Sequence, residues 1–136
     1  MDSVFVYFAN ADYDRIEAAA APLGFRNGVV ARDDDLFYFR RYTPEEQLVE
    51  LEEHEAKAIE SLLGSKHESA FEVACRHGAA ASFALEVINK LMQQFPSSAL
   101  DDDFGHFLSS SSVSALHAER PERGVYATRE LPKESP

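Results

Sequence analysis

The sequence predicts an α+β fold in which a mixed or antiparallel sheet carries packed helices, with a ferredoxin-like split β-α-β arrangement as the leading topology. Apolar stretches rich in β-branched and aromatic residues, typical of strands, occur at 3–9, 25–42 and 71–75. Amphipathic helical patterns at 43–63 and 79–95 lie between and after these stretches. Helices interspersed among strands that include a hairpin favour a mixed or antiparallel sheet.

The first strand is predicted at Ser3–Ala9. Both alternating faces of this stretch are apolar, which is typical of a central strand covered on its two sides. Polar residues at 10–14 supply capping side chains for a helix that follows, and Gly24 is suited to end it. Gly28–Ala31 and Leu36–Tyr42 are then the arms of a hairpin, because an aspartate-rich connection joins them.

The next element is a helix predicted at Thr43–Leu63. Thr43 is its N-cap, Pro44 takes the first helical position, Glu46 completes a capping box, and Gly64 ends the helix. The expected buried stripe comprises Leu48, Leu51, Ala58, Ile59 and Leu62. The outer face is strongly acidic and carries Glu45, Glu46, Glu50, Glu52, Glu53, Glu55 and Glu60.

The second half of the chain repeats these element types. A half-exposed strand is predicted at Phe71–Cys75, and a second amphipathic helix at Ala79–Phe95, which Pro96 ends. Residues 98–108 contain either a strand and a loop or a second hairpin around three aspartates. Val113–Ala118 fits a strand or a helix equally well.

The chain has 136 residues, of which 45% are hydrophobic and 11% aromatic. A chain of this length builds one core without a disulfide or metal, and this apolar content excludes wholesale disorder. We expect a single domain over residues 1–118. Residues 119–136 are rich in Pro, Glu, Arg and Lys, which predicts a mostly flexible tail.

The net charge of −11 and the pI near 4.8 exclude several classes of partner. Nucleic acids and anionic membranes are bound through clustered Lys and Arg, so neither is expected. A basic protein partner is favoured, because opposite charge speeds the encounter. One cysteine, no signal sequence and no apolar run of about twenty residues predict a soluble cytoplasmic protein; the oligomeric state stays open.

Two aspartate triplets are candidate cation ligands. Asp101–Asp103 lacks the alternating acids of a Ca²⁺-binding EF-hand loop, and Asp33–Asp35 lies in the predicted hairpin connection, where aspartate is common. The two triplets form a divalent site only if the fold brings them together. We interpret both as turns and predict no metal, cofactor or catalytic residue.

The single cysteine and the histidines are candidate zinc ligands or nucleophilic groups. Cys75-Arg76-His77 lacks the second ligand pair that a closed zinc site requires. Cys75 with His106 or His117 is a conceivable nucleophile and base, but the sequence has no Gly-x-Ser-x-Gly elbow or glycine-rich phosphate loop. We therefore interpret Cys75 as a small buried residue and expect a protein without enzymatic activity.

Acidic side chains around a few aromatics suit docking on a basic protein surface. The partner-binding side chains are predicted to be Glu50, Glu53, Asp101, Asp102, Asp103 and Tyr42. With its glutamate-rich helix at 43–64 and the closing stretch FPSSALDDDFG at 95–105, the chain resembles small acidic bacterial immunity proteins of polymorphic or contact-dependent toxin systems. The resemblance is one of layout over residues 1–118. It implies a toxin domain as partner, often a basic nuclease whose substrate cleft the inhibitor occupies.

Two other functions remain open. Ferredoxin-like sheets often bind ligands between sheet and helices, so the alternative is a small-molecule-binding regulatory domain. The third is a metal-assisted hydrolase that uses the aspartate triplets. We rank the protein-binding function first.

Overall fold

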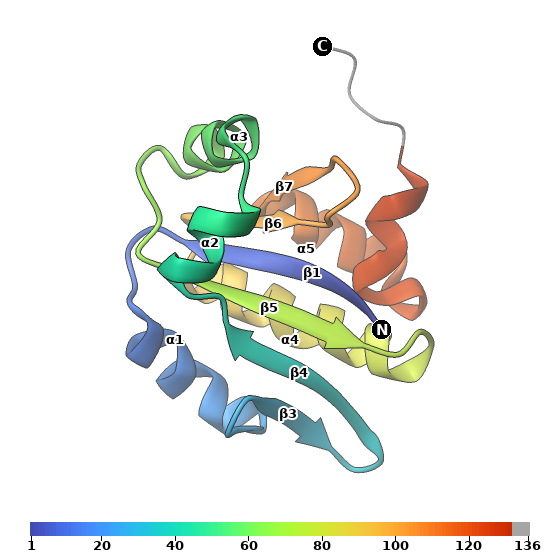
Figure 1. Ribbon diagram of the computed structural model, residues 1–136. Coiled ribbons are helices and arrows are strands. Elements are labelled where there is room, and N and C mark those ends of the chain that lie inside the picture. Colours follow the sequence, from blue (N-terminus) through green and yellow to red (C-terminus); the bar gives the residue numbers. More distant parts are fainter. Residues whose placement is uncertain (132–136) are drawn as a thin grey trace.

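A computed structural model of the chain describes residues 1–131, with the main chain alone at Glu130 (Figure 1). It confirms the predicted α+β class, since the strands form an antiparallel sheet on which helices pack. In chain order the elements are β1 (Asp2–Phe8), α1 (Tyr13–Ala20), the 3-10 turn η1 (Ala21–Leu23), β2 (Phe25–Arg26), β3 (Val29–Arg32), β4 (Asp35–Arg41), α2 (Pro44–Glu50), α3 (Glu53–Leu63), β5 (Ser69–Cys75), α4 (Ala79–Gln94), β6 (Ser98–Asp101), β7 (Phe107–Ser109), α5 (Ser110–Glu119) and the 3-10 segment η2 (Pro121–Glu130).

Two interlocked split β-α-β units form the centre of the sheet, which is the predicted ferredoxin-like arrangement. The strand order is β2-β3-β4-β5-β1-β6-β7, and neighbouring strands are antiparallel. Since β1 and β4 both run antiparallel to β5, they are parallel to each other, and α1 lies in the connection between them. In the same way β5 and β6 flank β1 and are joined by α4. The segments inserted after β4 and added after β6 shape the candidate site.

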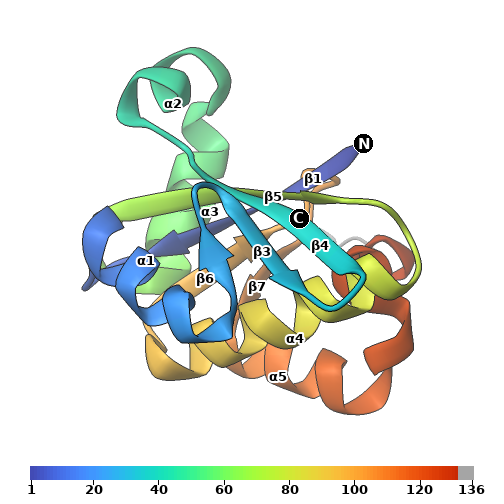
Figure 2. The same ribbon diagram turned by 90° about the horizontal axis from the view of Figure 1, so that it is seen from below.

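The main core lies between one face of the sheet and α1, α4, α5 and η2. Figure 2 shows α4 and α5 on one side of the sheet and α2 on the other. Val4, Val6 and Phe8 of β1 point into this core, where the rings of Phe39 and Phe71 stack with centroids 4.4 Å apart. The amphipathic helix α4 supplies the facing layer with Phe83, Ala84, Val87, Ile88 and Leu91. Full burial of such side chains contributes roughly 1.5–3 kcal/mol each, so this layer dominates stability.

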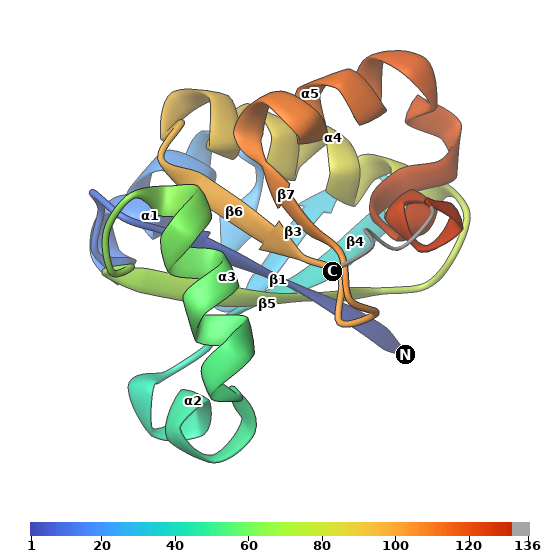
Figure 3. The same cartoon turned by 90° about the horizontal axis from the view of Figure 1, so that it is seen from above.

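The opposite face of the sheet carries α2 and α3, which together we call the arm (residues 44–63). The inner side of α3 covers one row of the sheet, packing Ile59 and Leu63 on Tyr7, Tyr42, Ala70 and Ala99. No residue of α2 is buried, and α2 projects away from the sheet (Figure 3). The apolar contacts of the arm are thus made by α3, while α2 is held through Gln47, which donates to the Tyr42 carbonyl oxygen (2.7 Å) and contacts the His67 ring (2.6 Å).

The helix predicted from residue 43 to residue 63 is in fact two helices. The predicted N-cap is confirmed: the Glu46 N–H donates to Thr43 Oγ1 (3.3 Å) and the Thr43 N–H donates to Glu46 Oε1 (3.1 Å). A second cap follows where α3 begins, because the Glu52 N–H donates to Glu55 Oε1 (3.0 Å). The new cap satisfies a main-chain donor that the break sets free.

The break lies at Leu51, whose extended conformation (φ −85°, ψ 116°) turns α2 away from the sheet. Leu48 is therefore not part of a buried stripe as predicted, and both it and Val49 are 87% exposed. Leu62 is exposed as well, whereas Ile59 is buried as predicted. Apolar periodicity alone located the inner side of α3 but not the change of direction before it.

The predicted hairpin forms, and a second hairpin forms later in the chain. The first pairs Val29 with Tyr38, and the second pairs Leu100 with Leu108, which decides between the two alternatives for that segment. The prediction that β5 is half exposed is wrong, because β1 and β4 flank it and both of its faces are largely covered. Only Glu72 in β5 is partly exposed.

The chain after β7 also differs from the prediction. Val113–Ala118 is helical and lies in α5. The expectation of a mostly flexible tail from residue 119 is wrong for residues 119–131, since η2 packs on α4 and buries Val125, Tyr126, Ala127 and Thr128. Residues 132–136 of that predicted tail lie outside the described residues.

A tyrosine joins η2 to the sheet. The hydroxyl of Tyr126 lies 2.5 Å from the Asp2 carbonyl oxygen and 2.7 Å from the Cys75 carbonyl oxygen. It also accepts the Cys75 N–H (3.2 Å). This one phenol therefore satisfies main-chain groups at the adjoining ends of β1 and β5, and it makes η2 part of the domain.

Candidate functional site

Beyond α3, part of the arm-side face of the sheet carries no helix in the described chain (Figure 1). The strand register places five side chains in one row across this region: Arg40, Glu72, Phe5, Asp101 and Phe107. Arg40 is exposed and Phe5, Glu72 and Phe107 are half-buried, so the row borders solvent. We call this row, together with the β6–β7 loop (residues 102–106), the open face.

Short polar contacts order the centre of the open face. The Ser3 hydroxyl donates to Glu72 Oε2 (2.7 Å), and Arg40 Nη2 lies 3.2 Å from Glu72 Oε1. The Phe5 ring packs against Tyr42, with ring centroids 4.7 Å apart. An aromatic surface at the foot of the arm therefore adjoins a carboxylate held in place by two neighbours.

Negative charge from separate parts of the chain converges on Asp101. Burial is the largest cause that raises the pKa of the Asp101 carboxyl to about 6, and the charges of Glu55 and Asp103 add to it. The N–H of Asp103 donates to Asp101 Oδ1 (2.8 Å) and opposes this shift. The pKa of Asp103 is raised as well, chiefly by burial and then by Glu55, although Arg129 opposes the rise. The arm and the β6–β7 loop thus hold carboxylates close enough to act on one another.

The other end of the acidic region lies over Tyr42. Burial raises the pKa of the Tyr42 phenol, and the charges of Glu50, Glu46 and Glu55 raise it further. Tyr7 behaves in the same way, because its pKa is raised first by burial and then by the charge of Asp101. The carboxylates of α2, α3 and the β6–β7 loop therefore gather around the aromatic foot of the arm, with Arg40 and Arg129 as neighbouring cations.

Asp102 has a structural role in the β6–β7 loop. Its Oδ1 accepts the N–H groups of Phe104 (2.8 Å) and His106 (3.0 Å). Its Oδ2 accepts the Thr128 hydroxyl (2.8 Å) and lies 2.6 Å from His106 Nδ1. The other ring nitrogen of His106 lies 2.8 Å from the Leu131 carbonyl oxygen. The carboxylate therefore joins the loop to the C-terminal segment.

The six predicted partner-binding residues separate into three groups. Glu50 and Glu53 on the arm and Asp103 in the β6–β7 loop are exposed, so their contact role stays a prediction. Asp102 and Tyr42 are 0% and 4% exposed, and the prediction that they contact a partner is corrected: one closes a loop and the other supports the arm. Asp101 is only 3% exposed, so it can affect a partner through its charge alone, and that role stays a prediction.

The conceivable nucleophile–base pairs do not form. Cys75 is buried as predicted, its Sγ lies 3.5 Å from the Tyr126 hydroxyl, and burial raises the pKa of its thiol. Both ring nitrogens of His106 contact acceptors: Asp102 in the β6–β7 loop and the carbonyl oxygen of Leu131, which follows η2. The Nδ1 of His117 lies 3.5 Å from the Asn89 side chain. Neither histidine is therefore placed to activate the thiol.

The two aspartate triplets do not meet. Asp33–Asp35 lies at the turn between β3 and β4, and Asp101–Asp103 begins at the end of β6; β5 and β1 separate β4 from β6. Three strand spacings correspond to roughly 14 Å. Within residues 1–131 no group of three or more His, Cys, Asp or Glu side chains is arranged to hold a metal ion. The metal-assisted hydrolase required the two triplets to lie together in a divalent site, and the fold keeps them apart.

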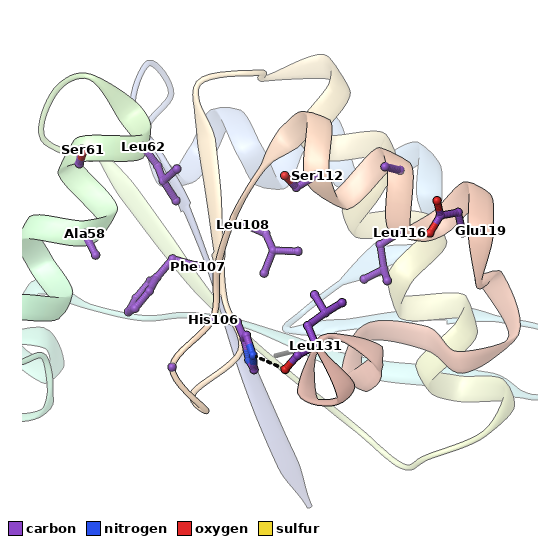
Figure 4. A pocket seen from close by; sticks show the side chains of 12 residues that line it. Ala58, Ser61, Leu62, His106, Phe107, Leu108, Ser112, Leu116, Glu119 and Leu131 are labelled. Carbon is purple, nitrogen blue, oxygen red and sulfur yellow. Dashed lines mark hydrogen bonds between the residues drawn. The ribbon is translucent and has the colours of Figure 1, made fainter. Parts of the chain in front are cut away.

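A groove of about 580 Å³ runs along the outer edge of β7 between α3 and α5 (Figure 4). Its lining is mainly apolar and includes Ala58, Leu62, Phe107, Leu108, Ala115, Leu116 and Leu131. Ser61, Ser112 and Glu119 supply polar groups, and the His106 ring closes one end with its bond to Leu131. This size and lining are typical of sites that bind small molecules or short peptide segments.

Sequence reasoning missed most of the residues that build these two sites. Phe5 and Tyr7 share a face because side chains alternate along a strand, but only the register with β5 and β6 shows that Phe5 neighbours Glu72 and Asp101. The groove depends on the direction of α3 after the break in the arm. No local sequence pattern indicates the strand register around Phe5 or the direction of α3.

None of the helices described in residues 1–131 combines the length and the apolar character needed to cross a membrane. No family model, curated protein or solved structure matches the chain.

Proposed function

We propose that the chain is a cytoplasmic protein-binding module, an immunity protein that inhibits a basic toxin domain by docking its acidic surface on it. The observation that carries this proposal is the convergence of carboxylates from the arm and the β6–β7 loop on one side of the sheet. Burying or crowding like charges costs stability, so a surface that keeps them favours a cationic partner.

The arm supplies an apolar anchor within this charge. Leu48 and Val49 are 87% exposed at the projecting end of the arm. Glu45, Glu46 and Glu50 lie beside them in the same short helix and are exposed. An apolar centre surrounded by charge is the usual anatomy of a binding surface, in which the apolar groups contribute affinity and the charges contribute rate and selectivity.

Inhibition follows from charge alone if the partner acts on a polyanion. A nuclease needs a basic cleft to hold phosphates, and an acidic arm that enters this cleft competes for the same cations. Long-range attraction brings the two proteins together quickly, and salt weakens that attraction. The inhibitor needs no chemistry of its own in this mechanism.

An immunity function predicts a toxin gene beside the gene for this chain, and co-expression provides the test. The chain should restore growth to cells that express the toxin domain. Glu50→Gln with Glu53→Gln should reduce the rescue and weaken the purified complex by about tenfold, which corresponds to roughly 1.4 kcal/mol. Asp33→Asn with Asp34→Asn, the same change in charge in the β3–β4 turn away from the arm, should leave both intact (Figure 1). Lack of rescue, or an equal loss with both pairs, would contradict the proposal.

The groove beside β7 favours a second candidate, a regulatory domain that binds a small molecule. Its volume and apolar lining suit a drug-sized ligand. A thermal-shift screen against metabolites tests this, since a ligand that binds only the native state raises the melting temperature. A stabilising compound whose effect is lost in Leu116→Glu, within the groove, but kept in Leu48→Glu, outside it, would favour this function.

A further inference from the structure

We propose that the outer edge of β7 binds an extended polypeptide segment, which adds a strand to the sheet within the groove between α3 and α5. This inference goes beyond the proposed docking of the acidic arm. It rests on a different set of residues and on main-chain hydrogen bonds instead of charge, so either can fail without the other.

The main chain of β7 offers unpaired hydrogen-bonding groups to the groove. The Asp102 N–H donates to the His106 carbonyl oxygen (3.2 Å), which identifies this pair as hydrogen-bonded in the β6–β7 ladder. In an antiparallel ladder such pairs alternate with pairs that exchange no bonds. Phe107, opposite Asp101, belongs to the second kind, so its N–H and C=O point away from β6.

These two main-chain groups have no hydrogen-bond partner within residues 1–131. An unpaired edge strand is a template for another strand, and natural proteins protect or use such edges. At this edge the chain leaves room beside β7, where the groove lies. An extended peptide lying in the groove would therefore supply hydrogen-bond partners for the N–H and C=O of Phe107.

The two walls of the groove lie on opposite faces of the sheet. Ala58 and Leu62 of α3 stand on the face to which Phe107 points. Ala115 and Leu116 of α5 stand on the other face. Figure 4 shows α3 and α5 on either side of β7, with Leu62 and Leu116 directed toward the space between them. A strand added beside β7 would be covered on both faces, like the central strands of this sheet.

This geometry specifies the bound segment. Successive side chains of a strand point to opposite faces, so one set meets the α3 wall and the next set meets the α5 wall. Both walls are mainly apolar, so consecutive residues of the segment are apolar, and β-branched residues fit best. Because β7 is short (Phe107–Ser109), the paired part comprises about three or four residues. Glu119 lies in the lining on α5, so a lysine or arginine beside the paired residues is favoured.

Main-chain pairing distinguishes this ligand from a small apolar molecule. Strand addition takes its affinity from main-chain hydrogen bonds and its selectivity from alternate side chains. A compact apolar ligand fills the volume but leaves the edge groups of Phe107 unpaired, which is costly where they are removed from water. The combination of a free edge and two apolar walls therefore favours a peptide.

The experiment uses the full chain and a phage library of random seven-residue peptides. Selected peptides are synthesised with single N-methyl groups along the main chain, and their affinities are measured by fluorescence anisotropy. We expect the loss of affinity to alternate along the peptide. At every second position the methyl group replaces an N–H that donates to β7, and at the positions between it replaces an N–H that faces solvent. The affinity should fall by about tenfold or more at the first set only. A profile without alternation would overturn the inference, as would the absence of any selected peptide.

Variants of the two walls locate the binding site. Leu62→Glu in α3 and Ala115→Glu in α5 should each reduce the affinity of the selected peptides by at least about tenfold. Leu48→Glu makes the same change on the exposed arm, outside the groove, and should leave the affinity unchanged. All three side chains are exposed, so the circular dichroism spectra and melting curves of the variants should match those of the parent protein. An equal loss with Leu48→Glu, or no loss with either wall variant, would place the peptide elsewhere and overturn the inference.

Discussion

Two adjacent aspartates illustrate how burial acts on single residues. Asp102 is completely buried, yet it accepts hydrogen bonds from two main-chain N–H groups and the Thr128 hydroxyl and also contacts His106. These donors satisfy the carboxyl oxygens of Asp102 in place of water. Asp101 accepts the N–H of Asp103 and faces the charge of Glu55, so its ionised form is disfavoured. The fold therefore uses Asp102 to close a loop, whereas the ionised form of the buried Asp101 costs stability.

That cost predicts a stability change with pH for Asp101→Asn. The pKa of Asp101 is about 6 in the folded protein and 3.8 ordinarily, so the folded state binds the proton more tightly. The contribution of Asp101 to stability is therefore fully present below about pH 4 and is lost as pH rises to 6. At about 1.4 kcal/mol per pH unit, the loss is on the order of 3 kcal/mol. Asp101→Asn, which keeps an acceptor for the Asp103 N–H, should be more stable than the parent protein at pH 8 by about this amount relative to pH 4.

Urea unfolding at pH 4 and pH 8 measures this difference. Asp34→Asn makes the same chemical change at an exposed turn position and should show no comparable gain at the higher pH. If the stability difference between Asp101→Asn and the parent protein is the same at both pH values, Asp101 is not the strained carboxylate that the structure indicates.

At the scale of elements, the most secure sequence predictions were those with a local physical cause. The Thr43 cap, the β3–β4 hairpin and the amphipathic helix α4 follow from capping chemistry, turn residues and apolar periodicity within a few residues. The docking of η2 was not predictable in this way. Its apolar residues are few, and its burial depends on Tyr126 reaching β1 and β5, which are distant in the sequence.

A glycine makes the docking of η2 testable. Gly124 has φ +73°, and a Cβ there would lie 2.3 Å from the Ala81 carbonyl carbon of α4. Gly124→Ala should therefore separate η2 from α4 and reduce the free energy of unfolding by about 3 kcal/mol, through a clash with main-chain atoms and a strained conformation. Gly64 provides the matched control, with φ +78° and open space around the added Cβ.

Gly64→Ala should cost only the strain of the left-handed conformation, about 1 kcal/mol. Guanidinium unfolding followed by circular dichroism compares the two variants. The near-ultraviolet signal of the tyrosines should change in Gly124→Ala, because Tyr126 leaves its buried site. Equal costs for the two substitutions would show that η2 does not depend on close approach to α4.

At the scale of the whole molecule, the open face is a product of topology. Phe5, Glu72 and Asp101 lie in neighbouring strands because β1 is central, yet their positions span most of the chain. The sequence indicated a strand at each place but not the register between them. The acidic composition predicted an acidic surface. The break at Leu51 and the β6–β7 loop determine where the carboxylates gather on it.

The net charge of −11 predicts a further property of the whole protein, a stability that rises with salt. The ion pairs that the structure describes are mostly at the surface, as in Arg40 with Glu72, and exposed pairs contribute little. Repulsion among the excess carboxylates acts over longer distances, and 0.15 M salt shortens its range to about 8 Å from about 30 Å at 0.01 M. The melting temperature should therefore increase by about 3 °C between these salt concentrations, a shift of the size that roughly 1 kcal/mol produces.

A variant of lower charge separates repulsion from other effects of salt. Substituting Glu50, Glu53, Asp33 and Asp34 by their amides changes the net charge from −11 to −11 + 4 = −7. All four side chains are exposed, so the substitutions leave the core unchanged. Because the repulsive energy grows faster than linearly with net charge, the salt-dependent increase in melting temperature should be clearly smaller in this variant. If the melting temperature of the parent protein falls with salt instead, surface ion pairs outweigh repulsion. The acidic surface would then be a balanced network, unsuited to a basic partner.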